Sequence, residues 1–147
     1  MQYLNLDSAF TPYGNGIQFE TFTFSGGEIH FRIVEDVSSI DEITITCRPT
    51  SFNDMGTILI AADALQRAGV KSLSLIIPYF PAARQDRIMV SGESLTVKIY
   101  ADLINSVGFE SVVVFDPHSD VTPALINNGK VCSNHALVNG IVSEMSD

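Results

Sequence analysis

The chain has 147 residues, of which 46% are hydrophobic, and its 17 Asp and Glu against 8 Lys and Arg give a net charge of −9. The length predicts one domain with a proper core, and the acidic balance argues against a nucleic-acid-binding surface. No stretch approaches the ~20 apolar residues of a membrane span, and the N-terminus lacks a basic start before an apolar core, so we expect a cytoplasmic protein.

The first predicted element is a β-hairpin between Ile17 and Val34, where apolar and polar residues alternate. The sequence "SGGE", Ser25 to Glu28, interrupts the alternation, and paired glycines supply the positive φ of a tight connection. A short β-branched strand, residues 42–47, follows. The hairpin suggests an antiparallel addition at one side of a larger sheet.

A helix is predicted next, because the apolar period changes after Ser51. Ser51 and Asp54 form a capping-box variant at its start, and Gly69 ends it. The apolar residues expected on one face are Met55, Ile58, Leu59, Ala62 and Leu65.

The second half of the chain alternates strands and helices, two of the strands being continuously apolar. This alternation predicts a parallel sheet covered on both faces. Ser91, Glu93 and Ser94 are expected to cap the second helix, with Leu95, Ile99, Leu103 and Val107 one turn apart. The elements are a strand at 72–77, a helix at 93–108, a strand at 111–115, a weaker helix at 122–127, a strand near 131 and a last helix from about Ala136.

Two polar clusters follow the two strongest strands. Arg84 and Arg87 come after the first, and Asp116 and His118 come after the second. Because the carboxyl ends of parallel strands meet at one edge, both clusters should lie together, where open α/β sheets bind ligands. Guanidinium groups match phosphate oxygens, and Asp116 with His118 offers metal ligands, so the pattern suggests binding of a Mg²⁺–nucleotide.

Plainer interpretations stay open beside this one. The segment from Arg84 to Arg87 can be a solvated loop paired with Asp86 and Glu93, and Asp116 and His118 can simply make strand-end hydrogen bonds. Cys47 and Cys132 lack CxxC spacing and predict buried free thiols. The chain contains neither a P-loop motif nor a Gly-x-Ser-x-Gly motif.

Five segments in this order resemble the N-terminal domain of the ribose-phosphate pyrophosphokinase family. They are "FSGGE" (24–28), "ADAL" (62–65), "IPYFPAARQDR" (77–87), "ESLTVKIYADLINSVG" (93–108) and "DPHS" (116–119). The resemblance implies an α/β, phosphoribosyltransferase-like three-layer α/β/α domain, with a mostly parallel sheet and an N-terminal β-hairpin, over residues 1–147.

The family transfers a diphosphoryl group from ATP to the C1 hydroxyl of ribose 5-phosphate, releasing AMP, with Mg²⁺ as cofactor. Family sites straddle a subunit interface, so the resemblance also implies a homo-oligomer. It places Arg84 on the triphosphate and Phe24 and Glu28 at the adenine of a neighbouring subunit. The residues it assigns to ATP are Arg84, Gln85, Asp86, His118, Phe24 and Glu28, and those assigned to the metal are His118 and Asp116.

The sequence departs from the family at several positions. Gly26 replaces an aspartate in "FSDGE", which affects one adenine contact. Gly92 and Ser94 replace arginine and proline in "SREP", a region of regulatory phosphate or nucleotide binding. Pro117 stands inside the family's "DLH". The family's second domain, which holds ribose 5-phosphate, has no counterpart in these 147 residues, so this chain alone is expected to be inactive.

Three functions therefore compete. The first is the ATP-binding half of a ribose-phosphate diphosphokinase in nucleotide biosynthesis, favoured by Arg84, Gln85, Asp116 and His118. The second is a non-catalytic regulatory or interaction module of the same family. The third is a generic flavodoxin-like or Rossmann-like nucleotide binder, against which the missing Gly-rich loop counts.

Overall fold

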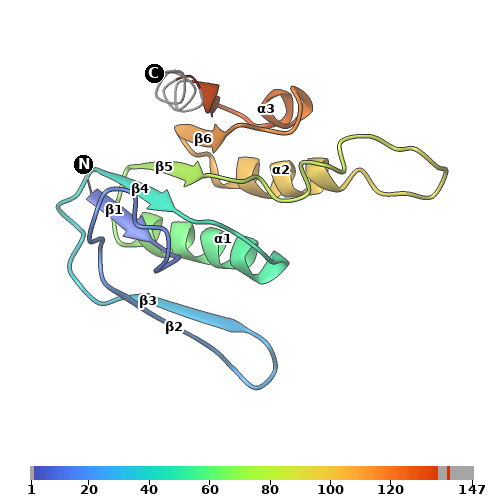
Figure 1. The fold of residues 1–147 in the computed structure, drawn as a ribbon. Coiled ribbons are helices and arrows are strands. Elements are labelled where there is room, and N and C mark those ends of the chain that lie inside the picture. Colours follow the sequence, from blue (N-terminus) through green and yellow to red (C-terminus); the bar gives the residue numbers. More distant parts are fainter. Residues whose placement is uncertain (1, 136–138, 140–147) are drawn as a thin grey trace.

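The computed structural model describes residues 2–135 and residue 139, and its centre is a twisted parallel sheet (Figure 1). The strand order is β1-β4-β5-β6-β7, and every pairing between these neighbours is parallel. The strands are β1 (Gln2–Asn5), β4 (Glu42–Thr46), β5 (Ser72–Ile77), β6 (Ser111–Phe115) and β7 (Gly129–Cys132). The predicted parallel sheet is confirmed, and β1 is a strand that the sequence pattern did not reveal.

Helix α1 (Phe52–Arg67) begins and ends as the sequence predicts. The Ser51 hydroxyl accepts a hydrogen bond from the Asp54 amide, and the Asp54 carboxylate accepts one from the Ser51 amide, which completes the capping box. Gly69 follows the helix with φ +100°, a value that favours glycine. Its predicted buried face is confirmed except at Leu59, which is only half-buried.

Helix α2 (Thr96–Val107) buries a different face from the one expected. Ile99 is 49% exposed, and Leu95 lies just before the first helical residue, where it occupies the N-cap position. The apolar positions of this helix fit two stripes at helical spacing. The second stripe is buried, and of the expected one Leu95 and Val107 pack against the core but are only partly buried. The buried residues are Val97, Ala101 and Ile104.

The core lies between one face of the sheet and helices α1 and α2. Alternate strand residues such as Ile45, Leu75 and Val112 share one hydrophobic cluster with the buried faces of both helices, and Ile76, which points the other way, is not part of it. A short helix, α3 (Val121–Leu125), connects β6 to β7. The last helix, expected from about Ala136, falls almost entirely on residues outside the described ranges.

The hairpin forms, but its expected position in the sheet is wrong. β2 (Phe19–Thr23) pairs antiparallel with β3 (Ile29–Ile33) as a separate two-stranded sheet. It packs on α1 through residues such as Phe31, which is 9% exposed and part of the core, and α1 lies between the hairpin and the main sheet (Figure 1). Aromatic residues on the hairpin's inner face explain this position, since they bury area against the helix.

The fold is therefore an α/β domain with a five-stranded parallel sheet plus a β-hairpin, as predicted. Within residues 2–135 and residue 139, no helix is long and apolar enough to cross a membrane. Cys47 is buried as expected, whereas Cys132 is exposed on β7, which corrects the expectation of two buried thiols.

Candidate functional site

The two polar clusters meet at the carboxyl edge of the sheet. β5 and β6 are parallel neighbours, and their last paired residues are Ile77 and Val114. The segments that follow are joined directly, because the Ser119 hydroxyl donates a 2.7 Å hydrogen bond to the Asp86 carboxylate. The predicted convergence of the two strand ends is thus a feature of the structure.

Asp86 is the buried centre of this junction. Its side chain is only 2% exposed, and Arg87 donates to both carboxylate oxygens, from Nε at 2.8 Å and from a terminal nitrogen at 3.2 Å. The hydrogen bonds from Arg87 and then from Ser119 hold the pKa of the Asp86 carboxyl far below its usual value. Burial opposes this effect, and the His118 side chain adds to the lowering of the pKa.

Arg84 differs from most of the other cations of the chain. Six of the eight Lys and Arg residues form ion pairs with carboxylates. Arg84 is exposed and has no ion pair or side-chain hydrogen bond with the part of the chain that the structure describes, and the same holds for Lys130 on β7. An unpaired guanidinium at a ligand-binding edge is available to an incoming anion.

A pocket of about 500 Å³ opens beside Arg84. One wall is a loop in which the Glu93 carboxylate accepts hydrogen bonds from the amides of Met89 and Val90, at 2.9 and 3.1 Å. Glu93 therefore pairs with backbone and not with the arginines, and it does not cap α2, whose first turn has no side-chain cap. The pocket residues are Arg84, Gln85, Arg87, Met89, Glu93 and Ser94.

Asp116 and His118 are both exposed, on the segment that follows β6. The Asn134 amide donates a 2.7 Å hydrogen bond to Oδ2 of Asp116, which leaves Oδ1 for another partner. Asp116 has φ +40°, and Ala82 on the neighbouring strand end has φ +60°. Such non-glycine conformations are unfavourable and occur disproportionately at functional sites; the sequence gives no signal for them.

Protein side chains alone do not form a metal site within the residues that the structure describes. No cluster of three or more His, Cys, Asp or Glu side chains that could hold an ion occurs within residues 2–135 and residue 139. Asp116 nevertheless fits Mg²⁺ that arrives with a nucleotide, because Mg²⁺ is commonly held by one or two carboxylates together with substrate phosphates and water.

Phe24 and Glu28 are not brought to this pocket. They flank the hairpin turn, on the other side of α1 (Figure 1). Phe24 is 52% exposed and packs edge-on against Phe22, with ring centroids 4.9 Å apart, and the Phe22 ring also contacts the His30 ring at a tilt.

At the hairpin turn, only one of the two paired glycines, Gly27, has positive φ. A Cβ on the other, Gly26, would lie 2.6 Å from a Glu28 carboxylate oxygen.

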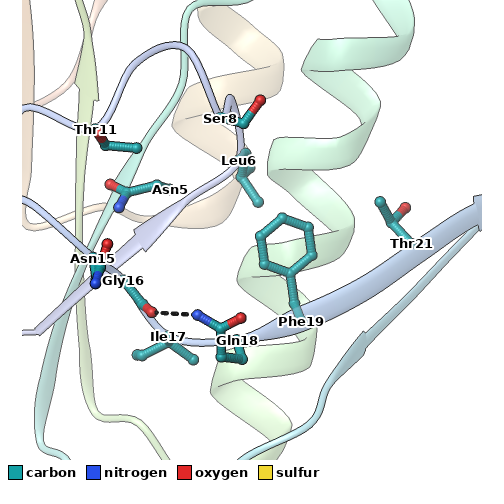
Figure 2. Close-up of a pocket in the computed structure, with 10 residues that line it drawn as sticks. All are labelled: Asn5, Leu6, Ser8, Thr11, Asn15, Gly16, Ile17, Gln18, Phe19 and Thr21. Atoms are coloured by element: carbon teal, nitrogen blue, oxygen red, sulfur yellow. Dashed lines mark hydrogen bonds between the residues drawn. The ribbon is translucent and has the colours of Figure 1, made fainter.

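A second pocket, of about 360 Å³, lies between the segment after β1 and the start of the hairpin (Figure 2). Its lining has amide, hydroxyl and apolar groups but no charged side chain, which makes it unsuitable for a triphosphate. The Asn5 amide is already bonded to Thr46 and Gly14, and Gln18 donates to the Gly16 carbonyl. The lining residues are Asn5, Leu6, Ser8, Thr11, Asn15, Gly16, Ile17, Gln18, Phe19 and Thr21.

The sequence of this chain matches a known protein family. Residues 15–108 match the family described as the N-terminal domain of ribose phosphate pyrophosphokinase. The ribose-phosphate pyrophosphokinase of Mycoplasma pneumoniae is 39% identical over 106 residues, 71% of this chain. That of Caldanaerobacter subterraneus is 41% identical over 102 residues, 68% of this chain. The chain spans 32% of the length of each.

A solved structure supports the same relationship at the level of the fold. The crystal structure of phosphoribosylpyrophosphate synthetase from Mycobacterium smegmatis aligns with a TM-score of 0.76 and 27% identity, over 88% of this chain and 44% of that one. The sequence match and the shared fold together place this chain in the ribose-phosphate pyrophosphokinase family, in which it corresponds to the N-terminal domain.

Proposed function

We propose that this chain is the ATP-binding half of a ribose-phosphate diphosphokinase, which converts ATP and ribose 5-phosphate to phosphoribosyl pyrophosphate and AMP. The observation that carries the proposal is the unpaired Arg84, which lines a pocket formed by the segment after β5. The Ser119–Asp86 hydrogen bond ties this segment to the one after β6. In a domain of net charge −9, an exposed arginine without a carboxylate partner favours an anionic ligand.

In this proposal Arg84 contacts the triphosphate, and Gln85, which lines the same pocket, donates to a phosphate or ribose oxygen. His118 lies on the neighbouring strand end and faces the same phosphates. Transfer of a phosphoryl group depends mainly on positioned positive charge and needs little covalent chemistry from the protein. Arg84 would supply such charge to the nucleotide half of the site.

Mg²⁺ would be held by Asp116 and His118 together with phosphate oxygens. When bound, the metal would neutralise charge on the phosphates and so assist displacement at phosphorus. The chain's own contribution is the Asp116 carboxylate, whose orientation the Asn134 amide fixes. A hydrogen bond of this type from a neighbouring residue is the usual way in which a metal ligand is oriented.

Phe24 and Glu28 would serve the adenine of a neighbouring subunit, because α1 separates the hairpin that carries them from the main sheet, and the Arg84 pocket lies on the segment after β5 of that sheet (Figure 1). The proposal therefore includes a homo-oligomer in the cytoplasm. A non-catalytic regulatory module of the same family is the alternative, and it predicts that nucleotide binding is lost or independent of Arg84.

Calorimetric titration with Mg²⁺–ATP tests the proposal on the wild type, on Arg84→Ala and on the control Arg67→Ala, which removes a cation from an exposed ion pair in α1. A charge-assisted contact to phosphate contributes roughly 1.5–3 kcal/mol, so Arg84→Ala should weaken binding about tenfold to a hundredfold, and Arg67→Ala should not. Absence of binding by the wild type, or equal affinity in Arg84→Ala, would contradict the proposal.

A further inference from the structure

Asp86 is the only charged residue that is buried within residues 2–135 and residue 139. Burying a carboxylate costs several kcal/mol unless it is paired and hydrogen-bonded. The resemblance to the family assigned this residue to ATP. Its burial raises the question of what the carboxylate does, because a phosphate would be repelled by it.

Asp86 accepts hydrogen bonds from residues that follow two different strands, β5 and β6. Arg87, from its own segment, occupies Oδ1 and Oδ2, and Ser119, from the segment after β6, also donates to Oδ2. The Ser119 oxygen in turn accepts a 3.4 Å hydrogen bond from the Val121 amide at the start of α3. One carboxylate thus connects the segment with Arg84 to the segment with His118.

We infer that Asp86 and Ser119 are positioning residues, which fix Arg84 and His118 relative to each other without touching the nucleotide. The inference rests on the proposed function and deepens it, because it gives Arg84 and Arg87 different roles. Arg87 neutralises Asp86, and Arg84, which has no partner in the described chain, remains as the phosphate ligand. Groups that bind one ligand from two segments require this kind of support, since a displacement near 1 Å is costly.

The test combines nucleotide affinity with NMR of the arginine side chains. Ser119→Ala removes the link between the segments but leaves the Arg87–Asp86 pair, and Ser119→Thr retains a hydroxyl. Asp86→Asn disrupts both connections. The matched control is Ser106→Ala, which removes an exposed hydroxyl that only bonds within α2. Each variant is titrated with Mg²⁺–ATP in a calorimeter, and its unfolding in urea is recorded.

Ser119→Ala should weaken Mg²⁺–ATP binding by up to roughly tenfold, the limit being reached when the whole free energy of this hydrogen bond serves to position the site. Ser119→Thr should recover most of the affinity, and Ser106→Ala should retain all of it. The Arg87 Nε–Hε resonance should persist in Ser119→Ala and change in Asp86→Asn. Wild-type affinity in Ser119→Ala would overturn the inference and leave the link as a purely structural tie.

The NMR spectra separate this inference from the proposed function. If the wild type binds no Mg²⁺–ATP, the proposed function fails on that result alone. The positional link then stands if Ser119→Ala shifts the backbone amide resonances of residues 84–87, and it falls if those resonances are unchanged. Should Asp86→Asn fail to fold, the two Ser119 variants still decide the question.

Discussion

The Ser119 hydroxyl donates to the Asp86 carboxylate across the carboxyl edge of the sheet, at 2.7 Å. These residues are 33 positions apart and follow different strands, so the hydrogen bond exists only in the folded chain. It makes the stability of the domain sensitive to the protonation of one carboxyl group.

Acid should therefore destabilise the protein through Asp86. Arg87 and Ser119 lower the pKa of this carboxyl in the folded state below its ordinary value of 3.8. A depressed folded pKa contributes stability that is complete above the unfolded pKa and is lost as the pH falls toward the folded one. The urea midpoint should decline below about pH 5, and less steeply in Asp86→Asn. An equal decline in both proteins would show that other carboxyls are responsible.

The two thiols should react at very different rates. Burial, followed by the charges of Asp54 and Asp7, raises the pKa of Cys47 to about 12, whereas Cys132 is exposed. The thiolate is the reactive form, so iodoacetamide at pH 8 should modify Cys132 rapidly and Cys47 only after denaturation. Peptide mass spectrometry identifies the site. Rapid modification of Cys47 in the native protein would mean that α1 opens readily.

The capping box of α1 should contribute measurably to stability. Burial, which would raise the pKa of the Asp54 carboxyl, is outweighed by hydrogen bonds from Thr50 and Ser51, and the pKa is lowered. Asp54→Ala removes these bonds and should cost about 1 kcal/mol of unfolding free energy. Asp63→Ala in the same helix, where the ion pair with Arg67 is exposed, should cost less. Equal losses in urea denaturation would contradict a specific role for the cap.

Self-association is expected through the outer face of the hairpin. Phe22 and Phe24 are 50% and 52% exposed, side by side on the same face, and such a patch favours burial against a partner. Sedimentation velocity at micromolar concentration should detect an oligomer, and the double variant Phe22→Ser, Phe24→Ser should shift it toward monomer. A wild type that sediments only as a monomer would contradict an interface at this hairpin.

The chain alone should make no phosphoribosyl pyrophosphate. Correct positioning of two reactants supplies roughly 7–11 kcal/mol toward the barrier, and holding a sugar phosphate normally uses a run of backbone amides at a helix N-terminus. No Gly/Thr-rich turn of this kind follows any strand in the sequence. Phosphorus NMR with ATP, Mg²⁺ and ribose 5-phosphate is the measurement. Product at an ordinary kinase rate would reveal a sugar site on this chain.

The sequence predicted the elements of the fold well where local signals were strong. The Ser51–Asp54 cap, Gly69 and Gly108 mark helix ends, and each signal is local. Prediction from the sequence failed where tertiary contacts decide between two patterns that fit the sequence equally well. Ile99 is exposed although Leu95 and Val107 of the same stripe pack against the core. The hairpin's aromatic residues pack on α1 rather than extending the sheet.

The candidate site was predictable in its location but not in its internal bonding. Parallel strands bring their carboxyl ends together, so Arg84 and His118 could be expected at one edge. Whether Arg87 or Arg84 pairs with Asp86 depends on the conformation of the loop in the folded chain, and so does the link to Ser119. Sequence spacing contains no information on that conformation.

The position of the hairpin on the far side of α1 has a consequence for how affinity is measured. If Phe24 and Glu28 complete the nucleotide site of a second molecule, each site is assembled only when two chains meet. Mass action then couples ATP binding to the association of two chains, so the apparent dissociation constant for ATP would fall as the protein concentration rises. A titration at one dilution would report how many chains are paired as much as how well each one holds the nucleotide.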